Sequence, residues 1–404
     1  MTPINAVDAY CINTDVCGND SSTMILRNLF IPTLLLLGST AFGQDKAVSF
    51  DKILNNFRNS WRDPLSGRKN DSVNISSLYR TDQFNVSISE NPIPFDTNHL
   101  VIKNPYYTDD FDDYDDNYIN YPVSYSVIYD KRLVSLFRTG KFVCHKLDNM
   151  ERDFDFEKKL NSKKFQYHWI IDDKLAAVAG GNIYVWNDKW TILKTKFPLE
   201  KQPKLFEDNE FIVFGDCHGE FGGTIYFFEK VSGDIYFTES TCTNSVSKKD
   251  NKYLVLAQLG HGMGFTEIKS IDNPRKLTKA KKSEIGKTKE GGALGYADKS
   301  EAYQKLLDLY SIQIFSTFNY QGRQLYIVRL NEMTFLSEIK GTEIQIVNPL
   351  FEKPFYTHQP VTTTYGNYTL VNLDFYGTAR DKEVSVIIVG QNKITKVDWN
   401  ETEE

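Results

Sequence analysis

The 404-residue chain contains no extended run of basic residues, and its formal net charge is −6. Binding to nucleic acid requires a concentrated positive face, so the sequence argues against a nucleic-acid partner. The longest apolar segment, Leu29–Gly38, has only ten residues, too few to cross a hydrocarbon core of about 30 Å. Nucleophile elbows, phosphate loops, paired-carboxylate signatures and dinucleotide fingerprints are also absent. The motifs therefore indicate no enzyme class.

The short apolar segment belongs to a candidate secretion signal. From Met24 the chain reads MILRNLFIPTLLLLGSTAFGQ, in which Arg27 precedes the apolar residues. Ala41–Gly43 matches the small-x-small pattern that signal peptidase cuts, so we predict cleavage before Gln44. The mature protein is then secreted or periplasmic and has no transmembrane anchor. Residues 1–23 are interpreted as an upstream extension, and the lack of a Cys just after the apolar segment argues against a bacterial lipoprotein.

Strands are favoured over helices by the composition. Aromatic residues make up 14% of the chain, with 27 Phe and 23 Tyr, and these types are enriched in strands. Two segments also superpose without gaps at an offset of 42 residues: DNEFIVFGDCHGEFGGTIYFF from Asp208 and DNKYLVLAQLGHGMGFTEIKS from Asp250. A repeat of this length that holds several short strands is typical of a propeller blade.

Strand–turn–strand units of the same kind recur along the rest of the chain. Their turns fall at Asp130-Lys131, Asp172-Asp173, Gln321-Gly322 and Gly366-Asn367, where Gly, Asn and Asp supply the positive φ that hairpin turns need. Together with the repeated pair, these units make six recognisable blades. The region resembles the β-propeller superfamily, without the signature of a named family. The resemblance implies an all-β propeller of about six four-stranded blades, with seven as the alternative.

The chain is predicted to have three parts. Residues 1–43 hold the extension and signal, residues 44–120 form an N-terminal region, and residues 121–404 form the propeller. We expect the N-terminal region to contain a short helix, strands that complete another blade or close the ring, and an acidic connector at residues 106–121. Residues 276–310 carry many lysines and no apolar period. They are predicted to form an exposed charged insertion that ends in a helix.

Candidate site residues lie in loops that are longer than hairpin closure requires. The connections at Cys217–Gly223, Gly260–Gly264 and Tyr376–Lys382 are predicted to join second to third strands. Ordering extra residues costs conformational entropy, so such loops suggest a role beyond closure. The resemblance implies that this face, called the top face, carries ligand sites near the channel. We predict that it binds a protein or carbohydrate ligand through Asp216, His218, Glu220, His261 and Arg380.

The same loops permit a second interpretation, in which a divalent metal is the cofactor. His218 and His261 occupy nearly matching positions in neighbouring repeats, and Glu220 is close to His218 in sequence. Imidazole and carboxylate groups are metal ligands, although the spacing matches no recognised metal motif. A metal site, a hydrogen-bonding loop and a simple structural turn all remain open, and the cofactor is undetermined.

Three cysteines remain after the predicted cleavage, so one thiol is left unpaired in an oxidising compartment. Cys217 follows the second strand and Cys242 the fourth strand of one predicted blade. Both then emerge on the same face. We predict a disulfide between Cys217 and Cys242, with Cys144 as the buried free thiol.

Three functions remain open at this point. The leading hypothesis is a secreted or periplasmic propeller that binds a protein or glycan through its top-face loops. The first alternative is a metal-dependent hydrolase or lyase with His218, His261 and Glu220 around the top-face opening of the channel. The second is a scaffold component of a cell-envelope complex. Convergence of the two histidines beside a carboxylate would favour metal chemistry, whereas side chains directed into solvent would favour binding or simple turns.

Overall fold

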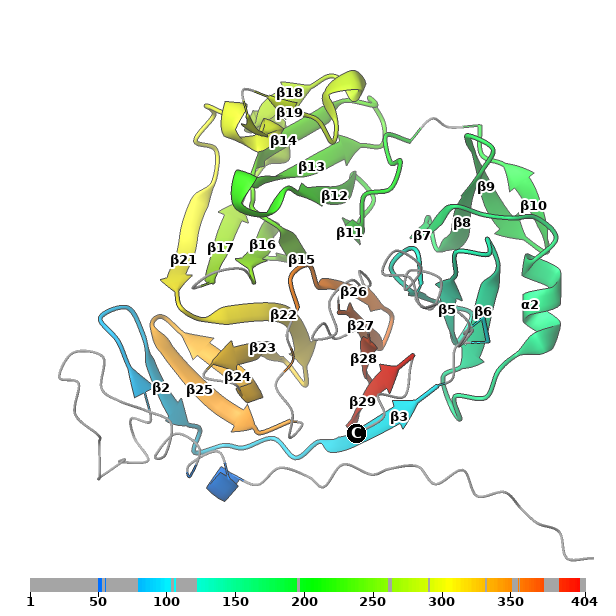
Figure 1. Ribbon diagram of the computed structural model, residues 1–404. Helices are drawn as coiled ribbons and strands as arrows, with labels where there is room; N and C mark the ends of the chain where they lie inside the picture. Colours follow the sequence, from blue (N-terminus) through cyan, green and yellow to red (C-terminus); the bar gives the residue numbers. More distant parts are fainter. Residues whose placement is uncertain are drawn as a thin grey trace, which may run out of the picture. The chain divides into compact units, whose positions relative to one another are not determined.

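The described part of the chain is a six-bladed β-propeller (Figure 1). The prediction of an all-β propeller is confirmed, and the number of blades is six rather than seven. The predicted signal and almost all of the acidic connector lie outside the described residues. The computed structural model describes residues 50–52, 55, 79–102, 105–106, 122–194, 197–260, 264–289, 291–330, 333–350, 355, 357–373 and 385–399.

Blades I, II and III follow one another along the chain, and the first strand of each lies nearest the axis of the ring. Blade I has three strands and is completed by a short helix. The elements of blade I are β4 (Val127–Tyr129), β5 (Arg132–Leu136), β6 (Phe142–Lys146) and α2 (Phe154–Leu160). Those of blade II are β7 (Tyr167–Ile171), β8 (Lys174–Ala179), β9 (Asn182–Asn187) and β10 (Lys189–Ile192). Those of blade III are β11 (Lys204–Glu207), β12 (Phe211–Cys217), β13 (Gly223–Glu229), β14 (Ile235–Glu239) and β18 (Thr278–Ala280).

Blades IV, V and VI complete the ring, and two of them receive strands from the N-terminal region. Blade IV consists of β15 (Thr243–Lys249), β16 (Lys252–Leu259), β17 (Phe265–Ile271) and β21 (Gln304–Tyr310). Blade V consists of β22 (Gln313–Tyr320), β23 (Arg323–Leu330), β24 (Met333–Lys340) and β25 (Glu343–Asn348), with β2 (Asn85–Ile88) and β1 (Tyr79–Arg80) added. Blade VI consists of β26 (Val361–Tyr365), β27 (Tyr368–Asn372), β28 (Ser385–Val389) and β29 (Lys393–Asp398), with β3 (Asp96–Val101) added.

Tight turns with left-handed backbone join the first two strands of several blades. Asp130 and Asp172 begin such turns with φ values of 47° and 47°, and Asp250 does so with φ of 49°. Asp tolerates this conformation better than most residues because its short polar side chain bonds locally. Asp208 and Asp250 sit in the corresponding segments of blades III and IV, between β11 and β12 and between β15 and β16. The 42-residue repeat therefore marks one blade.

Strands from the N-terminal region pair with the outer strands of blades V and VI. β2 pairs in parallel with β25, and β3 pairs in parallel with β29. An uncovered outer strand offers a row of unpaired backbone groups to other chains, so these pairings also protect two edges. Because β3 precedes blade I in sequence and joins the last blade, it closes the ring. The sequence predicts strands here that complete another blade or close the ring, and the structure adds them to the outer edges of blades V and VI.

Polar contacts and apolar packing complete the closure between blades VI and I. The side chain of Asn372 accepts from the backbone N–H of Ser126 at 2.8 Å and donates to its carbonyl oxygen at 3.0 Å. Around this pair, Leu133 and Phe137 of blade I share a buried cluster with Trp399. Satisfying both backbone groups of a buried residue through one side chain fixes the two blades in a single register.

The end of the insertion differs from its prediction. The sequence predicts a helix around residues 300–310, but Gln304–Tyr310 form strand β21 along the outer edge of β17. Leu307 and Leu309 alternate toward a core cluster, whereas Leu306 stays half exposed. The open edge of β17 offers a ladder of hydrogen bonds, and this tertiary pairing overrides the helix propensity of Gln, Lys and Leu.

The two faces of the ring carry different connections. Because neighbouring strands of a blade are antiparallel, loops between second and third strands emerge with the crossings from one blade to the next. This is the top face. Turns between first and second strands emerge on the opposite face, called the bottom face. None of the helices among the described residues is long and apolar enough to cross a membrane.

Candidate binding surfaces at the two faces

The loop between β12 and β13 is a tightly bonded turn on the top face. It contains the short helix η2 (Gly219–Phe221). The backbone N–H of His218 donates to Gly222 at 2.8 Å, and that of Phe221 donates to His218 at 3.2 Å. Gly222 has a φ of 86°, which a residue with a side chain adopts only with strain. The loop therefore has a defined conformation rather than many.

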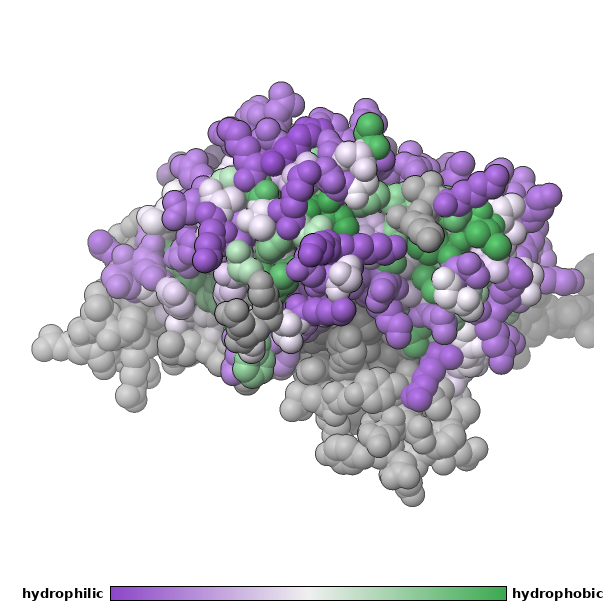
Figure 2. Space-filling model, turned by 90° about the horizontal axis from the view of Figure 1, so that it is seen from above, coloured by the Kyte–Doolittle hydropathy of each residue, from purple (hydrophilic) through white to green (hydrophobic). Residues whose placement is uncertain are grey.

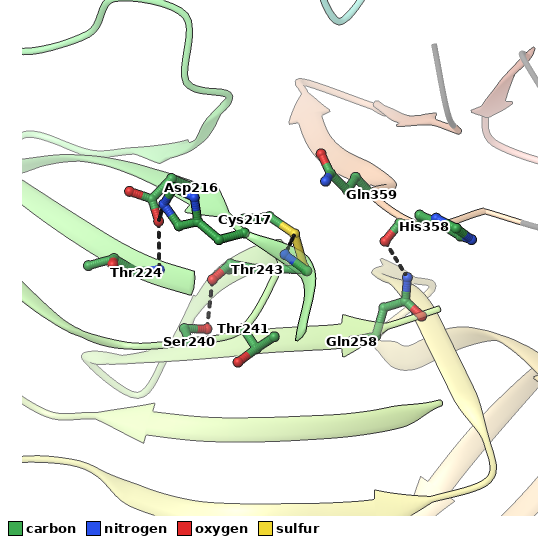
Figure 3. The surroundings of a disulfide bond; sticks show 12 residues. Asp216, Cys217, Thr224, Ser240, Thr241, Thr243, Gln258, His358 and Gln359 are labelled. Carbon is green, nitrogen blue, oxygen red and sulfur yellow. Dashed lines mark hydrogen bonds and ion pairs between the residues drawn. A yellow bond between two sulfur atoms is a disulfide. The ribbon is translucent and has the colours of Figure 1, made fainter. Parts of the chain in front are cut away.

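A disulfide between Cys217 and Cys242 ties this loop to the crossing that enters blade IV (Figure 3). Their Cα atoms are 4.4 Å apart and their sequence separation is 25. The crossing is itself ordered by a hydrogen bond of 2.6 Å from Thr243 to Ser240. Cys144 is a buried free cysteine, and burial raises the pKa of its thiol well above the usual value. Burial and a high pKa make Cys144 chemically inert.

Asp216 anchors the base of the loop inside blade III. Its carboxylate accepts from the backbone N–H of Thr224 at 2.9 Å and from the hydroxyl of Tyr226 at 2.7 Å. Burial raises the pKa of Asp216, and the hydrogen bond from Tyr226 and the nearby His218 oppose that rise. Both carboxylate oxygens are thus used within the blade, so Asp216 positions the loop and has little capacity left for a ligand.

The other predicted site residues are only partly brought together. Nε2 of His218 lies 3.6 Å from the carboxylate of Asp216 and makes no hydrogen bond within the described residues. Glu220 lies on η2 and is exposed. His261 and Arg380 lie outside the described residues, so the convergence of the two histidines stays a prediction. Among the described residues, no group of three or more His, Cys, Asp or Glu side chains is placed to hold a metal ion.

The insertion folds back over the top loop of blade III. β18 pairs with β14, and η5 (Leu294–Ala297) packs on β13 and β14. The backbone N–H of Gly286 donates to Tyr226 at 3.2 Å, and that of Gly295 donates to Thr224 at 2.8 Å. Tyr226 and Thr224 are the residues that also bond Asp216. The insertion and the disulfide-linked loop therefore form one unit.

Two exposed aromatic side chains stand at this junction, and we call them the aromatic platform. Phe221 is 65% exposed and Tyr296 is 56% exposed. The Tyr296 ring lies against the backbone of Gly222, since a Cβ atom there would be 2.5 Å from the ring. Glycine at this position thus lets the insertion pack directly on the loop. On the side of the ring that carries blade III, hydrophilic side chains cover most of the surface with smaller apolar patches between them (Figure 2).

A cavity with a volume of about 1020 Å³ lies among the described residues at the opposite end of the channel, on the bottom face. Turns and inner strands of several blades surround it, including Asp130-Lys131, Asp172-Asp173, Asp208-Asn209 and Gly366-Asn367. We call this cavity the channel mouth. Known ligand sites are commonly concave spaces of roughly 300–1,000 Å³, so its size suits a small ligand or part of a larger one.

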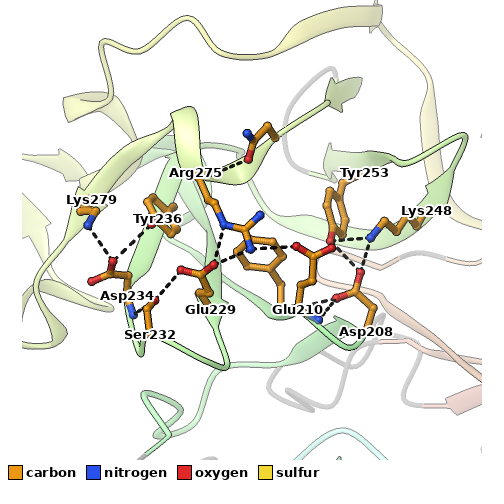
Figure 4. Close-up of polar contacts among 12 residues, drawn as sticks. Asp208, Glu210, Glu229, Ser232, Asp234, Tyr236, Lys248, Tyr253, Arg275 and Lys279 are labelled. Carbon is orange, nitrogen blue, oxygen red and sulfur yellow. Dashed lines mark hydrogen bonds and ion pairs between the residues drawn. The ribbon is translucent and has the colours of Figure 1, made fainter.

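Charged side chains around the bottom rim of blade III are paired with one another. Lys248 bonds Asp208 at 2.6 Å, and Tyr253 donates to the same carboxylate at 2.7 Å (Figure 4). On the outer side, Arg275 bridges Glu210 and Glu229. These pairs limit the net charge that the bottom face presents to a ligand. Exposed pairs of this kind contribute about 0–1 kcal/mol each to stability, so their main effect is on surface charge.

Sequence reasoning identified the turns of the channel mouth but gave them no functional role. Each turn has ordinary hairpin chemistry, and none is longer than closure requires. The available signal was positional, because every one of them joins the first two strands of a blade and such turns gather at one end of a propeller channel.

Comparison with known proteins indicates no family for this chain. No protein-family model matches it, and no curated protein sequence matches it significantly. Among solved structures, the tricorn protease is similar over 70% of this chain and 27% of its own, with 13% identity and a TM-score of 0.38. PorZ, a surface component of the type-IX secretion system of Porphyromonas gingivalis, is similar over 70% and 35%, with 13% identity and a TM-score of 0.34. BamB from Moraxella catarrhalis is similar over 70% and 78%, with 12% identity and a TM-score of 0.28.

The chain spans only about a quarter to a third of the length of the first two proteins. At these identities and TM-scores the likenesses concern the fold, and no argument about function rests on them.

Proposed function

We propose that this protein is an exported β-propeller that binds a protein partner through the aromatic platform on its top face. The observation that carries the proposal is the exposure of Phe221 and Tyr296 on a rigid support, with the Tyr296 ring against the backbone of Gly222, the next residue after Phe221. Aromatic residues supply a large share of the binding energy in protein interfaces, mainly where they meet a pocket in the partner.

The rigidity of the loop that carries Phe221 supports the proposed binding role. A flexible loop loses conformational entropy on binding, whereas a preformed loop has lost it already. Here the disulfide, the bonds within η2 and the bonds from the insertion all restrict the loop that carries Phe221. The platform is therefore prepared for binding before a partner arrives.

Export is the second part of the proposal, and two features support it. The segment from Met24 has the form of a secretion signal. A disulfide such as Cys217–Cys242 persists in oxidising compartments and is rare in the cytosol. N-terminal sequencing of the exported protein should find Gln44 first, and a chain that keeps its leader would contradict this assignment.

Loss of the two aromatic side chains of the platform should weaken binding of the partner protein. A tagged protein carrying Phe221→Ala and Tyr296→Ala should recover at least about 10-fold less of a specific protein from the envelope fraction of the source organism, because two aromatic contacts are worth more than about 1.4 kcal/mol. Quantitative mass spectrometry compares the amount of each protein recovered by the double variant and by the wild-type protein.

The matched control is Val231→Ala. Val231 is 92% exposed in the turn between β13 and β14, at the other end of the same blade, so its replacement should leave recovery unchanged. Equal recovery of every protein by the wild-type chain and the double variant, with both folded, would contradict the proposed interface.

A further inference from the structure

We propose that the channel mouth on the bottom face is a second binding site, which takes a short, uncharged oligosaccharide. The site is separate from the aromatic platform, because it is built by the turns at the opposite end of the blades. The proposal for this site can therefore be tested independently of the proposal that the top face binds a protein.

Pairing of most of the lining charges argues for an uncharged ligand. Lys230 bonds Asp172 at 2.8 Å and Glu207 at 2.6 Å. Glu207 also bonds Lys204 at 2.6 Å, and Lys248 bonds Asp208 at 2.6 Å. Three lining carboxylates and three lining ammonium groups thus neutralise one another. A strongly charged ligand would have to break these pairs and leave a partner unpaired, which is unfavourable.

Amide and hydroxyl groups line the space between the charged pairs. Asn209, Asn319 and Asn367 line the cavity and are exposed, and their side chains make no hydrogen bond to another described residue. Ser247 lines it from strand β15. An amide both donates and accepts, as does a hydroxyl. Sugar hydroxyls have the same dual character, so this lining can pair with several of them at once.

Aromatic side chains in the cavity lining are a second feature that suits a sugar ligand. Tyr129 and Tyr368 line the cavity from blades I and VI, and both are partly buried. A sugar ring has polar edges and an apolar C–H face, and an aromatic ring presents an electron-rich face of similar area. The lining thus contains both aromatic side chains and amides, the two kinds of group that a saccharide requires together. The volume of about 1020 Å³ accommodates a short oligosaccharide rather than a single small ion.

A glycan array tests the proposal with the full mature chain. We expect the wild-type protein to bind at least one class of neutral oligosaccharide. Ser247→Trp, which places a large ring in the cavity, should abolish that binding. Asn319→Ala should weaken it about 5- to 10-fold, the effect of losing one or two hydrogen bonds, when the same oligosaccharide is titrated by calorimetry.

Phe221→Ala is the control, since it removes part of the platform and leaves the channel mouth intact. Thermal unfolding establishes that each variant is folded, and Asn319→Ala, a change at an exposed position, serves if Ser247→Trp does not fold. The proposal is overturned if no neutral glycan binds the wild-type protein above the level of Ser247→Trp. It is also overturned if extended peptides, and not glycans, bind with the same sensitivity to the two variants.

Discussion

Acidification from pH 6.5 to pH 4 should lower the free energy of unfolding by about 3 kcal/mol for each of two buried histidines. Burial lowers the pKa of His168 and of His145 from 6.5 to about 4. In the unfolded chain both imidazoles take up a proton as the pH falls through 6.5, whereas in the folded chain they stay neutral until about pH 4. The unfolded state binds more protons in this window, so stability falls with pH. A shift of one pKa unit corresponds to about 1.4 kcal/mol.

The surroundings of the two histidines explain why the neutral form is required. In His168, Nε2 donates to the carbonyl oxygen of Val134 at 3.2 Å, so Nδ1 accepts from the hydroxyl of Ser124 at 2.6 Å. Protonation of Nδ1 would place a positive charge in a closed core and would require the Ser124 hydroxyl to accept instead of donate. His145 is 3% exposed beside Trp399 and makes no hydrogen bond through Nδ1 to a described residue. A charge there would have no compensating partner.

Urea unfolding at a series of pH values measures the effect. The slope of the free energy of unfolding against pH, between pH 6.5 and 4.5, should fall by about half in His168→Gln, because glutamine cannot take up the proton. Below pH 4 the histidines no longer cause the free energy of unfolding to change with pH. Its further decrease comes from protonation of carboxylates whose pKa is lowered by basic partners, such as Asp208 beside Lys248. A free energy of unfolding that stays constant from pH 6.5 to pH 4.5 would contradict this account.

Removal of the disulfide is expected to have a similarly large effect. In Cys217→Ala/Cys242→Ala, the free energy of unfolding should fall by roughly 3–4 kcal/mol, because the bond closes a sequence separation of 25 residues and restricts the unfolded chain. The loop that carries Phe221 also loses its covalent restraint, so affinity for the partner should fall as well. Urea unfolding with and without reductant measures the first effect.

The thiol count provides the control. Denatured without reductant, the mature wild-type chain should expose one alkylatable thiol, at Cys144. Reductant should bring the wild-type stability to that of the double variant and leave the variant unchanged. Three reactive thiols without reductant, or equal stability with and without it, would show that the bond does not form in the protein.

Local patterns allowed much of the fold to be predicted. The repeat that relates Asp208 to Asp250 and the turn residues of the hairpins are encoded over a few residues each, and they placed all six blades. The relation between Cys217 and Cys242 also followed, because the ends of alternate strands in a blade emerge on one face. These inferences need only strand order.

Features that depend on distant segments were not predictable in the same way. β2 and β3 pair with β25 and β29 across more than 250 residues, and nothing local in either segment identifies its partner. β21 contains good helix formers, but the open edge of β17 decides its conformation. The channel mouth is assembled from turns of several blades, so no single segment carries its signature.

Site-specific photo-cross-linking tests the central claim most directly. A benzoylphenylalanine in place of Phe221 keeps an aromatic ring on the platform and reacts with whatever contacts it. The account predicts one discrete covalent adduct with another protein in intact cells of the source organism, and no such adduct when the same group replaces Val231, which is exposed on the opposite face of blade III. No adduct from position 221, or the same adducts from both positions, would contradict binding through the aromatic platform.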